Sequence, residues 1–181
     1  MNLRTGNDHL LEATFSAEGR ASEIPESADA YGWLVGSWEL DVIHYWAMNV
    51  ARQKIKAEVH AGWALDGLAV QDVWIMPRRA DRGGHLDPKL NMYGTTLRVW
   101  DATIGAWRIT WRNPAGGHFA DQIGRRNGDD VVQIGVNPDG TPTRWSFREI
   151  TKDSFHWLGE SLGTDGKTWK VEGEFRGKRA G

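Results

Sequence analysis

Three side chains in the first hundred residues have the chemistry of an acid–base site: His44, Asp72 and Arg98. Histidine titrates near neutral pH, with a reference pKa of about 6.5, so His44 could act as a general base or as a hydrogen-bond partner for a ligand. A structural histidine bonded to a neighbouring side chain is an equally good interpretation. The sequence leaves both interpretations open.

Asp72 and Arg98 lie in neighbouring segments that both alternate apolar and polar residues. The alternation does not decide whether the face of Asp72 or the face of Gln71 points inward. An inward carboxylate needs a partner, because burying an unpaired charge is costly. Arg98 would supply that partner, or would hold a ligand carboxylate through two parallel hydrogen bonds. Because buried ion pairs commonly have structural roles, we favour a structural pair over catalysis.

Tryptophan is the most unusual feature of the composition, with 11 in 181 residues. A Trp ring usually lies in a core, cavity or interface, so its recurrence at alternating positions predicts an aromatic-lined hollow that suits a flat, apolar compound. The candidate ligand-binding residues are Trp46, Gln71, Trp74, Tyr93, Trp111, Asn113, His118 and Trp157. Asn113 would be a polar anchor, together with His44 and Arg98. His118 would either guard an entrance or be an exposed residue at the rim.

The elements that must position these side chains are about ten short alternating stretches between residues 37 and 179, separated by turn signals such as Asp66-Gly67. Strands joined by tight turns form an antiparallel meander, and a meander of this length normally closes to remove its exposed edges. We therefore predict an all-β fold, an antiparallel up-and-down β-barrel of about 8–10 strands with a short N-terminal helical plug.

Alternation with period two assigns one face of each strand to the interior. If Trp38 points into the barrel, His44 and Trp46 follow it inward, and Tyr45 points toward solvent or the rim. The same rule sends Val171 inward in the last strand. His44 would then be the first polar group of the cavity.

Length and composition indicate one domain behind a polar arm. Residues 1–28 are rich in Glu, Ser, Ala and Gly, and we expect a flexible N-terminal arm there, with residues 29–181 forming a single barrel domain. The N-terminus has neither the apolar run of a signal peptide nor that of a membrane span. The chain has no cysteine, which fits a reducing compartment. We expect a cytoplasmic protein.

Charge and histidine spacing argue against several kinds of partner. The formal net charge of -2 gives no sign of a nucleic-acid or membrane partner. The histidines show none of the usual metal-site spacings, and the lack of cysteine removes thiolate zinc sites. We therefore expect no metal, no nucleic acid and no membrane. A homodimer through paired edge strands or stacked barrel faces stays open.

The segment Gly36-Ser37-Trp38, within LVGSW, resembles the G-x-W motif that begins the first strand in the calycin superfamily. That group comprises lipocalins, fatty-acid-binding proteins and bacterial lipocalin-like barrels, including nitrobindin-like ones, and the resemblance covers about residues 30–179. It implies that Trp38 closes the barrel floor and that a late arginine, Arg176 or Arg179, packs across its ring. It also implies a small, largely apolar ligand inside the barrel.

The resemblance bears on cofactors and activity as well. Nitrobindin-like relatives bind haem through a late histidine, but no histidine follows His156 here, so we expect no cofactor and keep haem as a minor alternative. The leading hypothesis is a barrel that binds a small hydrophobic or aromatic molecule. The alternative is a cofactor-independent isomerase, cyclase or lyase, with His44 or Asp72 as acid or base and Arg98 as the anion anchor. An interaction module would instead require a filled barrel.

Overall fold

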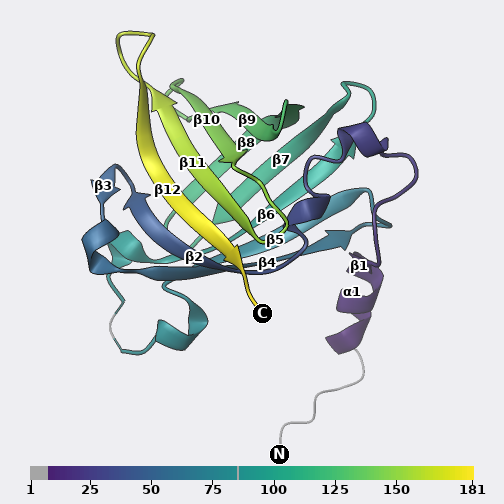
Figure 1. Ribbon diagram of the computed structural model, residues 1–181, viewed down its shortest axis with the longest axis horizontal. Coiled ribbons are helices and arrows are strands. Elements are labelled where there is room, and N and C mark those ends of the chain that lie inside the picture. Colours follow the sequence, from purple (N-terminus) through teal and green to yellow (C-terminus); the bar gives the residue numbers. More distant parts are fainter. Residues whose placement is uncertain (1–7, 85) are drawn as a thin grey trace, which may run out of the picture.

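The computed structural model describes residues 8–84 and 86–181, which form an all-β barrel with short helices at its ends (Figure 1). The elements are α1 (Asp8–Phe15), β1 (Ser16–Ala17), η1 (Glu26–Ala28), η2 (Gly32–Leu34), β2 (Gly36–Tyr45), β3 (Met48–Asn49), η3 (Ala51–Gln53), β4 (Lys56–Ala64), β5 (Ala69–Met76), η4 (Arg79–Asp81), η5 (Pro88–Leu90), β6 (Met92–Asp101), β7 (Ala106–Asn113), β8 (His118–Asn127), β9 (Asp130–Val136), β10 (Pro142–Arg148), β11 (Ser154–Leu162) and β12 (Trp169–Arg179), where η marks a 3-10 helix. None of the helices in the described residues has the length and apolar character needed to cross a membrane.

Ten strands of the described chain close into a ring. From β4 to β12 each strand pairs antiparallel with the next, and β2 completes the ring by pairing with both β12 and β4. The two-residue strands β1 and β3 extend β4 and β2 outside the ring. Closure pairs both sides of every barrel strand, and the predicted all-β, antiparallel up-and-down barrel is confirmed.

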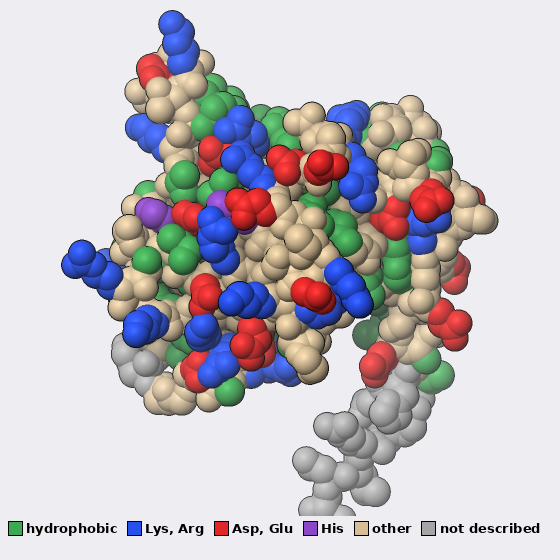
Figure 2. All heavy atoms as spheres, in the orientation of Figure 1, with side chains coloured by type: hydrophobic (Ala, Val, Ile, Leu, Met, Phe, Trp, Pro, Cys, Tyr) green, Lys and Arg blue, Asp and Glu red, His purple; other side chains and the backbone are tan. Residues whose placement is uncertain are grey.

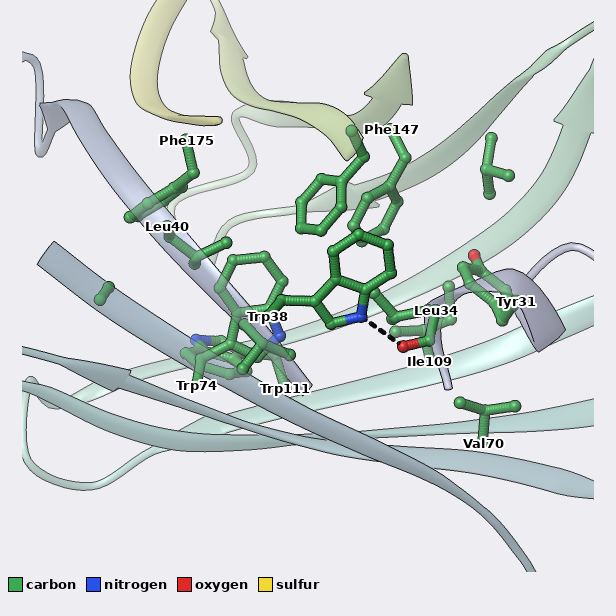
Figure 3. Packing of buried hydrophobic residues seen from close by; sticks show 14 of the residues in the cluster. Tyr31, Leu34, Trp38, Leu40, Val70, Trp74, Ile109, Trp111, Phe147 and Phe175 are labelled. Carbon is green, nitrogen blue, oxygen red and sulfur yellow. Dashed lines mark hydrogen bonds between the residues drawn. The ribbon is translucent and has the colours of Figure 1, made fainter. Parts of the chain in front are cut away.

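The segment before β2 fills one end of the barrel and forms the predicted plug. Its 3-10 helices η1 and η2 bring Tyr31 and Leu34 into the core, where both are completely buried. The Trp38 indole N–H donates a hydrogen bond to the Leu34 carbonyl at 2.7 Å (Figure 3). The ring of Phe155 meets the Trp38 ring edge-on at 5.0 Å between centroids. Aromatic side chains therefore leave little room at this end.

Arg179, the last residue of β12, stacks on Trp38. Its guanidinium carbon lies 4.1 Å from the ring centroid. Its Nη1 and Nη2 donate hydrogen bonds to the carbonyls of Val35 and Trp33 at 3.0 and 2.9 Å. The last strand is thereby joined to the plug and to the first strand of the barrel at one point.

Gly36 makes the approach of Arg179 possible. Its φ is +121°, and a Cβ at this position would lie 2.7 Å from Nη1 of Arg179. Arg176, the other arginine that the resemblance offers, instead pairs with Glu149 on the outer face at 3.2 Å. Arg179 is thus the residue that packs across the Trp38 ring.

The described part of the N-terminal segment contacts the barrel. The helix α1 lies outside the wall (Figure 1), and β1 pairs with β4 through Ser16 and Ala17. Ile24 is completely buried. Residues 1–7 of the expected flexible arm lie outside the described residues. From residue 16 onward, the segment assigned to the arm contributes backbone pairing and an apolar side chain to the barrel.

The outer face of β10, β11 and β12 carries charged side chains of both signs, which Figure 2 shows interspersed over the surface. Arg144 and Arg148 both pair with Glu160, at 2.9 and 3.4 Å. Partly exposed pairs of this kind contribute little stability each. The interactions that close the barrel therefore contribute more to the stability of the fold than the charged pairs on its outer face do.

We expect Arg179→Ala to lower the free energy of unfolding by about 2–4 kcal/mol, because it removes the cation–π contact and leaves backbone carbonyls without their donor. The matched control is Arg176→Ala, which removes an exposed ion pair and should cost less than about 0.5 kcal/mol. Urea unfolding followed by tryptophan fluorescence measures both. Equal losses in the two variants would contradict the closing role of Arg179.

Candidate functional site

The end of the barrel away from Trp38 holds a cavity of about 80 Å³. Trp46 stands at its mouth and is 43% exposed. The residues around the cavity come from strands on all sides of the ring: Tyr45, Trp46, Trp74, Met92, Thr96, Arg98, Trp111, Asn113, His118, Trp145, Trp157, Gly159, Glu172, Gly173 and Phe175. The predicted aromatic hollow is therefore present, and it lies at one end of the barrel.

Inward-facing glycines let the tryptophan rings pack against the wall of the barrel. A Cβ on Gly159 or Gly173 would come within 2.6 or 2.9 Å of the Trp157 ring, and a Cβ on Gly94 would collide with the Trp111 ring. A larger residue at any of these positions would push an indole into the cavity. The glycines thus keep the cavity open.

Trp46 is held in a strained turn between β2 and β3. Both Trp46 and Ala47 have left-handed backbone conformations, with φ of 50° and 59°, which residues other than glycine rarely adopt. The turn places the Trp46 ring 4.7 Å from the His118 ring, edge to face. Left-handed conformations at both central residues are the geometry of a two-residue hairpin turn, and this turn between β2 and β3 presents the Trp46 ring at the mouth.

His118 is the histidine that lines the cavity. The Trp111 indole N–H donates to its Nδ1 at 3.3 Å, so the proton of the neutral imidazole is on Nε2. Burial lowers the pKa of His118, and the Glu172 charge opposes this with a smaller effect. The ring is therefore neutral at pH 7 and keeps one N–H donor for a ligand.

Asn113 and Tyr45 supply further polar groups. The Asn113 Oδ1 accepts hydrogen bonds from the backbone N–H groups of Tyr93 and Gly116, at 3.1 and 3.2 Å, which fixes the orientation of the amide. Burial raises the pKa of Tyr45, although the N–H groups of Trp46 and Asn113 beside its hydroxyl oppose the rise. The Tyr45 hydroxyl stays protonated at neutral pH and can donate to a ligand.

Asp72 and Arg98 form a buried ion pair, 1% and 2% exposed. Nη1 of Arg98 donates to Oδ2 of Asp72, and the Thr96 backbone N–H donates to Oδ1 at 3.0 Å. Arg98 and Thr96 line the cavity, whereas Asp72 lies behind them and does not. The face of Asp72 therefore points inward, and the pair that the sequence predicted is confirmed.

The pair belongs to a larger buried network. The Gln133 Oε1 accepts from the Tyr31 hydroxyl at 3.0 Å and from Nε of Arg98 at 3.5 Å, and the Gln133 amide donates to Gln122 at 3.1 Å. Burial raises the pKa of Tyr31, so its hydroxyl remains a donor. Gln122 of β8 and Gln133 of β9 thus supply hydrogen-bond partners to the buried network. This is why the polar side chains of β5 and β6 can point into the barrel.

Glu172 is the carboxylate among the described residues that line the cavity. The pairing of β12 with β11 passes from Gly173 to Val171, which leaves Glu172 as the extra residue of a β-bulge. A bulge changes the alternation of side chains, and here it turns Glu172 inward in place of Val171. The Ser161 Oγ donates to the Glu172 Oε1 at 2.7 Å. Our inward prediction for Val171 is therefore wrong.

Most of the predicted site residues meet at the cavity: Trp46, Trp74, Arg98, Trp111, Asn113, His118 and Trp157. Four others do not line it: His44, Asp72, Gln71 and Tyr93. Gln71 lies on the outer face of β5 and donates to the Thr95 hydroxyl at 3.0 Å. Tyr93 is 45% exposed and packs against the guanidinium of Arg82. Both side chains point outward because successive residues of a strand alternate between its two faces, and each of these residues lies next to one that faces inward.

The inward prediction for His44 is wrong, as is the outward prediction for Tyr45. The pairing of β2 with β12 skips Ile43, which is the extra residue of a second β-bulge. The bulge reverses the alternation beyond it, so Tyr45 is buried inside the barrel and His44 lies on the outer face. There the His44 Nδ1 lies 3.4 Å from Oε2 of Glu174.

Sequence reasoning missed Tyr45, Trp145 and Glu172 as residues of the site. The signal for Glu172 is the glycine that follows it, because glycine inside a strand often marks a bulge. The inward position of Tyr45 follows from the bulge at Ile43, and no glycine lies beside this bulge to mark it in the sequence. Trp145 lies at an inward position that alternation along its strand predicts.

The cavity is small compared with ordinary ligand pockets. Its volume of about 80 Å³ is far below the roughly 300–1,000 Å³ of pockets that hold drug-sized ligands. Within residues 8–84 and 86–181, no group of three or more metal-binding side chains is placed to hold a metal ion. The chemistry available in the cavity is that of aromatic contact, hydrogen bonding and one carboxylate.

Comparison with known proteins gives no family assignment. The chain matches no protein-family model. It also matches no curated protein. The functional argument therefore rests on the geometry of the cavity.

We expect His118 to make stability fall as the pH drops below about 6.5, the ordinary histidine pKa. The unfolded chain binds a proton there, whereas the folded chain, in which the pKa of His118 is lowered, resists protonation. The His118→Gln variant should lose less unfolding free energy than the wild type between about pH 7.5 and about pH 5. Above about pH 7.5 the imidazole is neutral in both the folded and the unfolded chain. The difference in unfolding free energy between the wild type and the variant should therefore be constant there. If the unfolding free energies of the wild type and of His118→Gln had the same pH dependence, His118 would not be desolvated in the folded protein.

Proposed function

We propose that this protein binds a small hydrophobic or aromatic molecule in the cavity at the open end of its barrel. The observation that carries the proposal is the convergence of five tryptophans, with Tyr45 and Phe175, on a space that they line without filling. Aromatic walls with a few fixed polar groups are typical of small-molecule sites. The polar groups are Asn113, His118 and Glu172.

The contrast between the two ends of the barrel supports this proposal. At the plug end, Trp33, Trp38 and Phe155 pack in edge-to-face contacts at 5.0–6.0 Å between centroids, as a solid core does. At the other end, Trp145 and Trp157 make a similar contact at 5.6 Å but also border open space. A module that used only its outer surface would have no need of an unfilled aromatic end.

The volume limits what the ligand can be. An engineered cavity of roughly 150 Å³ in another protein accepts benzene, and the cavity here is smaller, at about 80 Å³. The part of the ligand that enters is therefore compact, and any longer part must extend past Trp46 toward solvent.

The stacking of Arg179 on Trp38 is what the calycin resemblance implies, and it supports membership of that group.

The alternative of an enzyme that uses His44 or Asp72 as its acid or base has no support from the geometry. Catalysis by His44 or Asp72 requires that they reach a ligand held by Arg98. His44 lies on the outer face, and Asp72 lies behind Arg98 and neutralises its charge. We therefore assign the cavity a binding role.

Screening a panel of neutral, anionic and cationic single-ring and branched aliphatic compounds by tryptophan fluorescence tests the proposal. At least one compound should bind with saturable quenching, and Trp145→Ala should weaken its binding about tenfold, through loss of one aromatic contact. The matched control is Trp100→Phe, which alters a tryptophan that does not line the cavity and should leave the affinity unchanged. Absence of binding by every compound, or an equal loss in both variants, would contradict a ligand site at this end.

A further inference from the structure

We propose that the ligand of the cavity is a small organic cation, an amine or quaternary ammonium compound whose head group sits among the tryptophans beside Glu172. This inference rests on the proposed function and names the chemical class of its ligand. It depends on three properties of the cavity: the sign of its charge, its aromatic faces and its size.

The charge of the cavity is negative because of Glu172. Its carboxylate accepts a hydrogen bond from Ser161, a neutral donor, and in the described part of the chain it forms no ion pair with Lys or Arg. The bulge that turns it inward interrupts the ladder between β11 and β12. Bulges next to binding sites commonly serve to re-aim one side chain.

The positive charge of Arg98 does not offset the negative charge of Glu172. Its guanidinium is bound to the Asp72 carboxylate, and it stacks over the rings of Tyr31 and Phe147, at 4.9 and 5.9 Å to their centroids, on the side of the plug. The two charges of this pair cancel. The remaining charge of the lining is the single negative charge of Glu172.

His118 adds no positive charge that would repel a cation. Its Nδ1 accepts a hydrogen bond from Trp111, and its pKa is lowered by burial, so the imidazole is neutral at pH 7. A cationic ligand would disfavour protonation of this ring further. The neutral ring of His118 and the ring of Trp46 lie together at the mouth, 4.7 Å apart.

The tryptophan rings supply the second part of cation recognition. The faces of aromatic rings carry partial negative charge, and cages of aromatic residues bind quaternary ammonium groups through cation–π attraction, most strongly with Trp. Trp145 lies between Trp111 and Trp157, at 6.4 and 5.6 Å between centroids, so the three rings form a continuous wall. A neutral aromatic ligand would use the same wall but would leave Glu172 with Ser161 as a hydrogen-bond donor and without a positively charged partner.

The size of the cavity limits the head group to a compact one. The space of about 80 Å³ is smaller than the roughly 150 Å³ that accepts benzene, so size restricts the bulk of the ligand, and the charge of Glu172 and the aromatic faces select a cation over a neutral group of the same shape. The polar end of such a ligand could reach the Tyr45 hydroxyl or the His118 Nε2–H near the mouth.

Choline and 3,3-dimethylbutan-1-ol form the test pair, because they share one shape and differ in having a cationic nitrogen or a neutral carbon at the centre of the head group. Titration followed by tryptophan fluorescence and by calorimetry should show choline binding at least about tenfold more tightly. In Glu172→Gln the preference should fall to less than about threefold, while binding of the neutral alcohol is retained. Glu149→Gln, which removes an exposed outer-face carboxylate, is the matched control and should keep the full preference.

Each outcome decides between the two proposals. If the neutral alcohol, or a neutral or anionic compound from the panel, binds as well as choline or better, the cation assignment is overturned and the small-molecule site stands. If the preference for choline persists in Glu172→Gln, the carboxylate is not its source and the inference fails. If no compound of any charge binds, both the cation assignment and the proposed function fail.

Discussion

The stacking of Arg179 on Trp38 is the interaction on which the rest of the structure depends. It ties the last residue of β12 to the start of β2 and to the plug carbonyls at the point where the ring of ten strands closes. Because the plug fills this end with aromatic side chains, the space that the barrel encloses is confined to the opposite end. The position of the cavity is thus a consequence of how the barrel is closed.

The chemistry of the open end follows from two bulges on the same pair of closing strands. The bulge at Ile43 turns Tyr45 inward, and the bulge at Glu172 turns its carboxylate inward. The Ala47 N–H donates to the Glu172 carbonyl at 3.0 Å, so the strained Trp46 turn is fixed to the bulge beside it. The bulge at Glu172 therefore both carries the charge of the cavity and holds the turn that presents the aromatic ring at the mouth.

The sequence predicts the barrel well because its signals are local. Alternation and turn residues identify the strands, and Gly36-Ser37-Trp38 identifies the first one. The phase of the strand that carries Asp72 could not be predicted, since its inward face depends on Gln133 and Gln122, which lie far along the chain. The bulges were missed for a related reason, because a bulge is a property of two paired strands. His44 and Tyr45 are consequently assigned to the wrong faces and Glu172 is missed, whereas Asn113 and the four predicted tryptophans, Trp46, Trp74, Trp111 and Trp157, do line the cavity.

The most direct test of the central claim, that small molecules enter the aromatic end of the barrel, is two-dimensional NMR of the indole N–H groups during titration with the compound panel. Entry into the cavity should shift the signals of Trp46, Trp145 and Trp157 with saturation, while those of Trp33, Trp38 and Trp107 at the plug end stay in place. Shifts confined to the plug-end indoles, or no saturable shift with any compound, would contradict the account.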